Sequence, residues 1–530
     1  MRNRAGSQPG GAAGAGAALE VGGRSWDDAG VLADDDLERL RSRFIEVDYT
    51  VDAIMKLVGD SAQAALGRNN TTPARRRLAD DHGPVATLAK LWPLQARVSS
   101  DDLDRALPGM RQSLLDTGMI RIDHDQVRAL IDLRPYGSDD GAAGWIFSDL
   151  TPGLDGPMTP VAEDFVLGVS PASMTLAELT FRRPVGSALD LGTGCGVQSL
   201  HLARHADNVV ATDVNRRALA MARATMRLNG VDVDLREGSL YEPVADEAFD
   251  LIVTNPPYVM SPPATDGRLT YREAGLVGDE LVRRVVVDGA ARLNPGGSLQ
   301  VLGNWAQLTG RPWQERLQGW VEPTGCDAHI LRREELDPYE YIEIWLADAG
   351  LVGSPDYRSR YEAWCDYFDR LGIESVGMGW LTLTRAERER PAITIEDWPY
   401  PVEQPIGPAW AERRDAVELA RRLSDAELLN RRWQLAPDVE QETVGRPGVA
   451  DPEAIVLRQQ RGFRRAVRAG TVLAGVAGAC DGDLRLDQIV GGVATILDLD
   501  AQIVAGEVLT EVRQLVVDGL LRESSIQDVE

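Results

Sequence analysis

Cysteine is scarce in this chain of 530 residues: the four cysteines are scattered, and none forms a Cys-x-x-Cys pair. This pattern excludes a dense disulfide framework, disfavours a structural zinc site and fits a reducing cytoplasm. Long apolar runs are also missing, because no stretch approaches the roughly 18 apolar residues that a membrane span requires. The glycine- and alanine-rich start has no apolar segment of the signal-peptide type. We therefore predict a cytoplasmic protein that makes no membrane contact and holds no metal.

Positive charge is in short supply as well. The chain has 56 Lys and Arg against 82 Asp and Glu, a formal net charge of −26. This balance argues against broad attraction to nucleic acid or to an anionic membrane, although a local basic groove remains compatible with it. The hydrophobic fraction of 44% supplies enough material for buried cores, and the length suggests about three domains.

The N-terminal part reads as a tail followed by a helical domain. Residues 1–24 are low-complexity sequence and predict a disordered tail, and residues 25–148 predict a mainly helical domain. Within it, three short helices and a hairpin over 119–133 resemble a winged-helix module, a shape used for nucleic acid, for protein contact or as a scaffold. The segment 103–116, where a basic recognition helix would lie, mixes both charge signs. This favours a structural or protein-docking role.

From Gly186 onward, short apolar runs alternate with longer amphipathic runs, which is typical of a parallel α/β sheet. We predict one domain over 149–390, with a helix over 357–371 between late strands at 341–346 and 379–384. The earlier elements are strands at 187–189, 209–212, 233–236, 250–254 and 298–302, and helices at 198–206, 216–229 and 279–293.

The C-terminal part begins with a proline-rich run. Residues 391–408 predict a linker, and residues 409–530 a helical, winged-helix-like domain. The basic cluster Arg461–Arg468 could contact phosphates, but a solvated helix face is the favoured reading.

A glycine loop follows the first strand of the α/β region, in Asp190-Leu191-Gly192-Thr193-Gly194-Cys195-Gly196. Glycine lets the backbone pass close to a ligand where a Cβ would collide. The spacing differs from the Gly-x-Gly-x-x-Gly of dinucleotide enzymes, which aims a helix N-terminus at a pyrophosphate. S-adenosylmethionine has no phosphate; its ammonium group needs acceptors and a nearby anion, which Asp190 and the loop carbonyls could supply.

A second acidic residue, Asp213, ends the following strand. A carboxylate at this place can accept both ribose hydroxyls in a bidentate hydrogen bond. Together with the glycine loop, Asp213 therefore predicts a nucleoside site.

The third signal is Asn255-Pro256-Pro257-Tyr258, where the fourth strand leaves the carboxyl edge of the sheet. The two prolines stiffen the loop and push Asn255 into an extended form. The Asn255 side-chain oxygen and the Pro256 carbonyl then form two convergent acceptors that suit an –NH₂ group. Binding both hydrogens orients the nitrogen lone pair toward a sulfonium methyl. Tyr258 offers a flat face for a planar amide or base.

Two other signals are set aside. His201 and His205 have helical spacing that could bind zinc, but no third ligand lies nearby in the sequence. Cys195 has no visible partner base, so a nucleophilic role is not expected.

Together these segments resemble class I S-adenosylmethionine-dependent methyltransferases of the amino-methylating Asn-Pro-Pro-Tyr group. The nearest likeness is to HemK-like glutamine methyltransferases and small-methyltransferase-domain relatives, over roughly 149–387. The resemblance implies a Rossmann-like α/β sheet of seven strands, one of them antiparallel, and S-adenosyl-L-methionine as cofactor. The implied cofactor contacts are Asp190, Gly192, Thr193, Gly194, Gly196, Asp213, Val214, Ser239, Leu240 and Asn255, and the implied catalytic residues are Asn255, Pro256, Pro257 and Tyr258. Ser239 stands where the family usually has an acidic or amide residue against adenine.

Three functions compete. The first is N-methylation of a protein glutamine, as in a release factor, with the flanking domains recognising the substrate. The second is methylation of an exocyclic amino group of adenine or guanine in RNA or DNA, which the same motif also serves. The third is a regulator that binds the cofactor without turnover. The intact Asn255 and Tyr258 argue against this third function.

Overall fold

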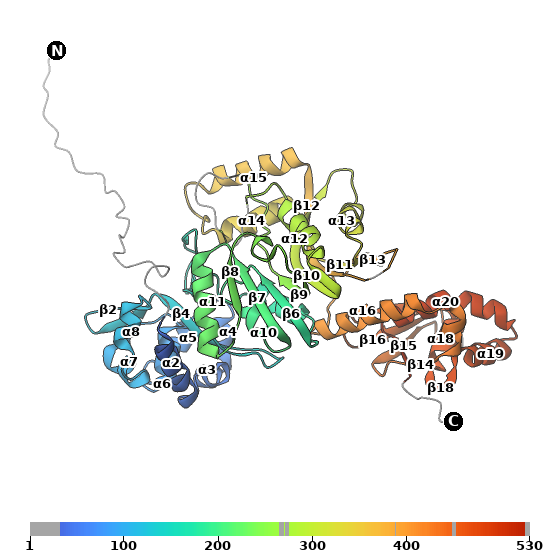
Figure 1. The fold of residues 1–530 in the computed structure, drawn as a ribbon, viewed down its shortest axis with the longest axis horizontal. Coiled ribbons are helices and arrows are strands. Elements are labelled where there is room, and N and C mark those ends of the chain that lie inside the picture. Colours follow the sequence, from blue (N-terminus) through green and yellow to red (C-terminus); the bar gives the residue numbers. More distant parts are fainter. Residues whose placement is uncertain (1–31, 264–269, 271–274, 387, 448–451, 525–530) are drawn as a thin grey trace, which may run out of the picture.

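The computed structural model describes residues 32–263, 270, 275–386, 388–447 and 452–524. The predicted tail over 1–24 lies outside the described residues. A central sheet with its helices is flanked by an N-terminal unit and by a C-terminal unit reached through α16 (Gly407–Arg422) (Figure 1). No helix in the described part of the chain combines the length and apolar character needed to cross a bilayer.

The N-terminal unit begins with a set of short amphipathic helices. In α2, one face buries Leu37, Leu40 and Phe44 at helical spacing. The next helix is capped by Thr50, whose side chain accepts a hydrogen bond from the Ala53 N–H at 3.2 Å. The helices are α2 (Asp34–Glu46), α3 (Val51–Val58), α4 (Asp60–Leu66), α5 (Thr72–Arg77) and α6 (Pro84–Leu91).

Short helices and strands complete this unit. The first three strands form an antiparallel sheet in the order β1-β3-β2, and the last two pair as a hairpin. The predicted hairpin over 119–133 is therefore shorter in the structure, because residues from Ile131 onward leave it and pair with β5. The elements are β1 (Val98–Ser99), α7 (Ser100–Ala106), α8 (Arg111–Asp116), β2 (Ile120–Asp123), β3 (Gln126–Ala129), β4 (Ile131–Gly137) and β5 (Ala143–Asp149).

The central sheet of the described residues has eight strands in the order β13-β11-β12-β10-β9-β6-β7-β8. Strand β12 runs antiparallel to β10 and β11, and the other neighbours pair in parallel. The strands are β6 (Val185–Leu191), β7 (Ala206–Asp213), β8 (Asp234–Glu237), β9 (Phe249–Thr254), β10 (Leu293–Leu308), β11 (Asp327–Leu336), β12 (Ile373–Thr384) and β13 (Ile393–Asp397).

The expected seven strands are thus exceeded by one. The additional edge strand is β13, which lies in the span 391–408 that we predicted as a linker. It pairs in parallel with β11 from Ala328 to Arg332. Its Ile393 and Ile395 pack against a buried core of the sheet, and Glu396 hydrogen-bonds His329 at 2.8 Å. These contacts explain why a segment next to prolines is held as a strand.

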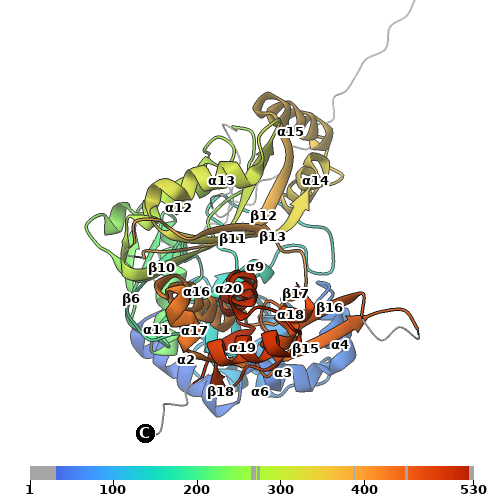
Figure 2. The same cartoon turned by 90° about the vertical axis from the view of Figure 1, so that its right-hand side faces the viewer.

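Helices cover both faces of this sheet: Figure 2 shows α12 and α13 on one side, and α9 and α16 on the other. Helix α11 matches its predicted span, whereas α10 ends at Leu202 rather than at residue 206. The reason is the strand pairing that follows, in which the Val185 N–H already donates to the His205 carbonyl at 2.9 Å. These helices are α9 (Pro171–Leu179), α10 (Val197–Leu202), α11 (Arg216–Asn229), η1 (Glu242–Val244), α12 (Glu280–Ala290), α13 (Trp313–Val321) and η2 (Glu322–Thr324).

Two helices are inserted between β11 and β12: α14 (Pro338–Asp348) and α15 (Tyr357–Leu371). The strand predicted at 341–346 is wrong, because these residues belong to α14. Asp337 caps this helix by accepting hydrogen bonds from the N–H groups of Tyr339 and Glu340, and Pro338 opens it. A short apolar run is compatible with either a strand or a helix, and here the Asp337 cap favours the helix. In Figure 1 both helices lie at the top of the molecule.

The C-terminal unit has a core of its own, which runs from Ala420 to Leu521. The basic cluster Arg461–Arg468 is not a helix face: it forms a loop and the start of β17, and the buried Arg465 hydrogen-bonds Glu396 of β13 at 2.5 Å. The elements after α16 are α17 (Asp425–Asn430), β14 (Arg432–Leu435), β15 (Val439–Val444), β16 (Ala454–Gln459), β17 (Ala466–Ala469), α18 (Thr471–Gly478), β18 (Asp481–Arg485), α19 (Leu486–Ile496), α20 (Ala501–Val517) and β19 (Leu521–Glu523).

The N-terminal unit shares one buried core with the central unit, and the C-terminal unit contributes Trp410 and Phe463 to another core of the central unit. The core shared with the N-terminal unit includes Phe44 and Trp92 of the N-terminal helices, and also Val197 and Leu200 of α10 and Met221 of α11. Strand β5 lies against α11, where the Thr225 hydroxyl accepts a hydrogen bond from the Phe147 N–H at 3.1 Å. The N-terminal helices therefore support the two helices that follow the glycine loop and β7.

Candidate active site

The glycine loop leaves β6 and enters α10 through three glycines with left-handed backbone. Their φ angles are +76° at Gly192, +55° at Gly194 and +87° at Gly196, which other residues rarely adopt. A Cβ at Gly192 or Gly194 would meet no atom within 4 Å, whereas one at Gly196 would meet Met226 Cε at 3.0 Å. The first two glycines therefore border open space, and Gly196 lets α10 and α11 pack closely.

Asp190, at the end of β6, is 1% exposed. Its Oδ2 accepts hydrogen bonds from the hydroxyls of Thr193 and Ser199, both at 2.7 Å. Burial raises the pKa of Asp190 to about 6, and the Asp213 carboxylate adds to this rise while the two hydroxyls oppose it. The Asp190 carboxylate thus fixes the shape of the loop and places a titratable negative charge beside it.

Asp213 ends β7 and joins the glycine loop to the start of α11. Its Oδ2 accepts a hydrogen bond from the Gly194 N–H, and its Oδ1 from the Asn215 N–H, both at 2.9 Å. Burial raises the pKa of this carboxyl. A carboxylate has about four acceptor positions, so each Asp213 oxygen retains capacity for a ligand hydroxyl.

Asn255-Pro256-Pro257-Tyr258 follows β9 at the carboxyl edge of the sheet. The Thr254 hydroxyl donates to the Leu191 carbonyl at 2.7 Å, which fixes the start of this loop against the end of β6. Asn255 Oδ1 is buried and has no hydrogen-bond partner among the described residues. Buried acceptors without a partner are rare and call for an explanation. A ligand N–H that reaches Asn255 would satisfy this oxygen.

One cavity of about 510 Å³ lies against all these segments. The predicted residues that line it are Asp190, Gly192, Thr193, Gly194, Asp213, Val214, Ser239, Leu240, Asn255, Pro256 and Pro257. Gly196 and Tyr258 are not among its lining residues. The structure therefore brings together residues from β6, β7, β9 and the segment after β8, which lie up to 67 positions apart in the chain.

Tyr258 contacts the first inserted helix instead. Its ring meets Trp345 of α14 edge-on, with 6.3 Å between the ring centroids. The Tyr341 hydroxyl accepts hydrogen bonds from the Met260 N–H at 3.0 Å and from Asn304 Nδ2 at 2.9 Å. Behind Tyr341, the ring of Phe368 from α15 lies 5.7 Å away between centroids. The insertion α14–α15 thus forms the support of the Asn255–Met260 loop, and the stacking role of Tyr258 stays a prediction.

Several lining residues were missed by the sequence analysis. Phe165, Val166, Leu167 and Gly168 form one wall, and they precede the first strand of the sheet, where no motif marks them. Gln198 and Ser173 form another part of the lining. Ser173 belongs to the capping box that starts α9. The spacing of Ser170 and Ser173 is therefore a sequence signal for the start of a helix. Gln198 is a lone polar residue in an apolar run, which is a weak signal.

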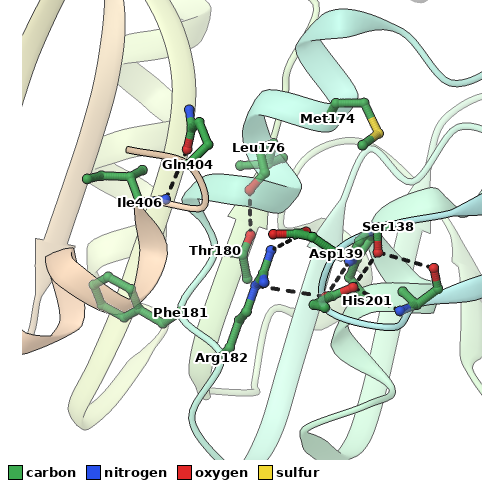
Figure 3. A network of polar contacts seen from close by, with 12 residues as sticks. Ser138, Asp139, Met174, Leu176, Thr180, Phe181, Arg182, His201, Gln404 and Ile406 are labelled. Atoms are coloured by element: carbon green, nitrogen blue, oxygen red, sulfur yellow. Dashed lines mark hydrogen bonds and ion pairs between the residues drawn. The ribbon is translucent and has the colours of Figure 1, made fainter. Parts of the chain in front are cut away.

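Figure 3 shows His201 in a network of polar contacts, and no cluster that could hold a metal ion occurs among the described residues. The His201 Nε2 lies 2.7 Å from the Tyr136 hydroxyl and its Nδ1 lies 2.7 Å from Asp140 Oδ2. Burial lowers the pKa of His201 although Asp140 opposes this shift. The network fastens the β4–β5 hairpin to α10. Cys195 is buried, and burial raises the pKa of its thiol to about 11, which makes it a poor nucleophile.

The residues present fit S-adenosyl-L-methionine. Two carboxylates, Asp190 and Asp213, line the cavity, and negative charge there suits a ligand that carries ammonium and sulfonium charges. The glycine loop offers space where a Cβ would otherwise project. The Arg284 guanidinium, also in the lining, already pairs with Glu280 at 3.0 Å, so the cavity offers little to a phosphate.

Comparison with known proteins finds methyltransferases that are similar to part of this chain. Residues 168–318 match the family described as Methyltransferase small domain, and residues 46–130 match a domain of unknown function, DUF7059. A ribosomal protein uL3 glutamine methyltransferase from Bradyrhizobium diazoefficiens is 31% identical over 28% of this chain and 50% of its own length. A release factor glutamine methyltransferase from Geobacter sulfurreducens is 34% identical over 28% of this chain and 55% of its own. A ribosomal RNA small subunit methyltransferase C from Salmonella arizonae is 32% identical over 33% and 45%.

The predicted resemblance to HemK-like and small-domain methyltransferases is thereby confirmed. The chain spans about half the length of the curated relatives that it matches. Residues 168–318 are thus similar to a small methyltransferase domain, and they lie in a Rossmann-like α/β sheet.

Proposed function

We propose that this protein is an S-adenosylmethionine-dependent N-methyltransferase whose acceptor is the side-chain amide of a protein glutamine. The observation that carries the proposal is the buried Asn255 Oδ1, which has no partner among the described residues and belongs to a residue that lines the candidate cofactor cavity. An acceptor in this place fits a substrate that presents N–H groups.

In the proposed site each part of the cofactor has a counterpart in the chain. The backbone at Gly192 and Gly194 passes beneath it, Asp213 accepts the ribose hydroxyls, and Asp190 contributes negative charge. Val214, Ser239 and Leu240 line the end of the cavity where adenine would lie. When bound, the cofactor supplies a methyl group on a positively charged sulfur.

The acceptor amide is oriented by the loop after β9. Asn255 Oδ1 and the Pro256 carbonyl accept the two N–H hydrogens, which turns the nitrogen lone pair toward the methyl group. Both oxygens also offset the positive charge that develops on nitrogen. Because the proton can leave after methyl transfer, the reaction needs no strong general base. Pro256 and Pro257 keep the acceptors from moving.

Charge favours a protein acceptor over nucleic acid. The insertion α14–α15, which supports the acceptor loop, has seven acidic residues and three basic ones between 338 and 371. These are Glu340, Glu343, Asp348, Asp356, Glu362, Asp366 and Asp369 against Arg358, Arg360 and Arg370. A phosphate backbone would be repelled by this balance, whereas a basic protein would be attracted. Two of the matched relatives are named as glutamine methyltransferases of protein substrates.

Methylation of an exocyclic amino group in RNA is the second candidate, and one matched relative is named as a ribosomal RNA methyltransferase. The order α6-β1-α7-α8-β2-β3 in the N-terminal unit supports a winged-helix-like module, a shape that some nucleic-acid readers use. The third candidate, a cofactor-binding regulator, would bind S-adenosylmethionine without turnover.

We divide the chain into an N-terminal domain over 25–148, a methyltransferase domain that begins at 149 and extends past the predicted end at 390 to include β13, and a C-terminal domain over 409–530. The separate C-terminal core supports the second boundary, whereas the first rests on the sequence pattern, because the N-terminal and central units share a core. The two flanking domains are proposed to recognise the macromolecular substrate, and the proposed location is the cytoplasm.

The test is methyl transfer from radiolabelled S-adenosylmethionine to fractionated extract of a strain that lacks this protein. We expect label that protease removes and nuclease does not, followed by mass spectrometry that places the methyl group on a glutamine. Label that only nuclease removes would replace the proposal by the RNA or DNA candidate. Cofactor binding without label in any fraction would favour the regulator. The Asn255→Ala variant is the matched control for background labelling.

A further inference from the structure

Gln198, the second residue of α10, is a buried polar side chain without a role in the proposed reaction. It is 6% exposed and lines the candidate cofactor cavity together with Ser173. Its Nε2 donates a hydrogen bond to the Ser173 carbonyl at 2.7 Å. Its Oε1 is buried and has no hydrogen-bond partner among the described residues.

The orientation of this amide is determined by its neighbour. Only the NH₂ end of the amide can bond to the Ser173 carbonyl, because a carbonyl oxygen in its place would meet another acceptor. The oxygen is therefore fixed on the other side. A buried amide oxygen without a partner is costly, so Gln198 is an acceptor that lacks a donor.

Two other acceptors near the glycine loop are already engaged. Asp190 Oδ2 accepts hydrogen bonds from two hydroxyls. The Thr212 carbonyl accepts hydrogen bonds from the N–H groups of Gly192 and Thr193, both at 2.9 Å. From the sequence alone, we expect Asp190 and the loop carbonyls to receive the ammonium group of the cofactor. These bonds leave Asp190 as a nearby charge rather than as a free hydrogen-bond acceptor at Oδ2.

S-adenosylmethionine has three kinds of N–H or O–H donor: the ribose hydroxyls, the adenine amino group and the ammonium group. The proposed site gives the hydroxyls to Asp213 and places adenine beside Leu240. Asp190 and Gln198 lie at the two ends of the glycine loop and line the same cavity. In the proposed site this leaves the amino-acid end of the ligand beside them.

We infer that the side-chain oxygen of Gln198 accepts a hydrogen bond from the ammonium group of the cofactor and so selects ligands that carry an intact amino-acid end. The inference rests on the proposed function, because it assumes that S-adenosylmethionine occupies this cavity. Gln198 acts here as a binding residue and takes no part in the transfer of the methyl group.

The test uses binding, not activity. Calorimetric titration of the full chain compares S-adenosylhomocysteine with its analogue in which hydrogen replaces the amino group. Wild-type protein should prefer the parent ligand. In Gln198→Met, which has similar volume and no amide, we expect affinity for the parent ligand to fall about tenfold, as for one lost hydrogen bond to a charged group. The deaminated ligand should bind as before, within about twofold.

Gln198→Glu is the comparison variant: it loses the donor to the Ser173 carbonyl, as Gln198→Met does, but it retains an oxygen acceptor of the same length and should keep the preference for the ammonium group. Equal weakening of both ligands in Gln198→Met, or an unchanged preference there, would overturn the inference. Melting temperatures establish whether each variant folds. If the Met variant does not, the side-chain amide resonance of Gln198 in wild-type protein labelled with nitrogen-15 glutamine gives the answer. It should shift with the parent ligand much more than with the deaminated one, and equal shifts would refute the inference.

Failure here and failure of the proposed function can be told apart. If wild-type protein does not bind S-adenosylhomocysteine at all, the proposed function fails. If it binds the parent and the deaminated ligand equally, only the role of Gln198 fails.

Discussion

The two halves of the candidate site are built in different ways. In the cofactor half, the carboxylates of Asp190 and Asp213 are hydrogen-bonded to the glycine loop and to the turn after β7. In the acceptor half, Asn255 Oδ1 has no partner among the described residues, and the loop is held from behind by α14 and α15. The two carboxylates of the cofactor half are thus held by the core sheet and its loops, whereas the acceptor half depends on an insertion. Substrate choice should follow the insertion, and cofactor choice should not.

The largest difference between loss of methyl transfer and loss of cofactor affinity should come from Asn255→Ala. The change removes one of two acceptors that align the amide nitrogen, and we expect methyl transfer to fall about 100-fold or more. Affinity for S-adenosylhomocysteine should change little, because Asp213 and the glycine loop are untouched. Single-turnover transfer and calorimetry measure the two quantities. Asn208→Ala, at an exposed amide that bonds to the Gly186 carbonyl, is the control. Full turnover in Asn255→Ala would refute the assignment of the acceptor site.

Asp213→Ala should affect the other half. It removes the proposed ribose acceptor, and we expect binding of S-adenosylhomocysteine to weaken by about 1–3 kcal/mol, or roughly 5- to 150-fold. The hydrogen bonds to Gly194 and Asn215 are lost as well, so the melting temperature should fall slightly. Asp246→Ala, at an exposed carboxylate, controls for the loss of charge. Normal affinity in Asp213→Ala would mean that the ribose lies elsewhere.

Tyr341→Phe tests the support of the acceptor loop from α14. Without its hydroxyl, the buried N–H of Met260 loses a partner, at a cost of about 1–3 kcal/mol. We expect kcat/KM for the macromolecular substrate to fall about tenfold, with unchanged cofactor affinity. Tyr361→Phe removes a hydroxyl that bonds Glu343 on the exposed side and should be neutral. Equal losses in both variants would mean that the insertion acts as a substrate-binding surface rather than as a support.

The smallest effect should be a pH dependence in the cofactor half. Burial raises the pKa of Asp190 to about 6, and its ionised form attracts the ammonium group. Affinity for S-adenosylhomocysteine should therefore fall as the pH drops below about 6, by at most about tenfold per pH unit. In the free protein the sign is opposite: Asp190 favours folding at low pH, and this contribution is lost as the pH rises from about 4 to about 6. Asp190→Asn should flatten the binding profile, and an unchanged profile would exclude Asp190 as its origin.

The same contrast explains what could be predicted from the sequence. The cofactor half depends on local signals, because glycines that need positive φ and an acid at a strand end can be recognised one by one. The long amphipathic helices α11 and α15 also matched their predicted spans, since their apolar periodicity is strong. The acceptor half was predicted at Asn255 to Tyr258, where two prolines restrict the chain.

What escaped prediction depends on distant contacts. Residues 341–346 were predicted as a strand because a short apolar run does not distinguish strand from helix without its cap at Asp337. The edge strand β13 could not be foreseen, since it depends on pairing with β11. Gln198 and the Phe165 wall reach the cavity only through tertiary packing, and the single-residue signal at Gln198 means little until Ser173 lies beside it.

The shared core of the N-terminal and central units has a consequence for cooperative unfolding. Helices α10 and α11 pack in one core with α2 and α6, whereas the C-terminal unit has its main core to itself and adds only residues such as Trp410 and Phe463 to the central unit. The segments that hold the cofactor and the N-terminal helices should therefore melt as one thermodynamic body. Addition of S-adenosylhomocysteine should raise that transition by mass action and leave the transition of the C-terminal unit where it was. The DUF7059 region then belongs to the ligand-linked part of the molecule, although none of its residues lines the cavity.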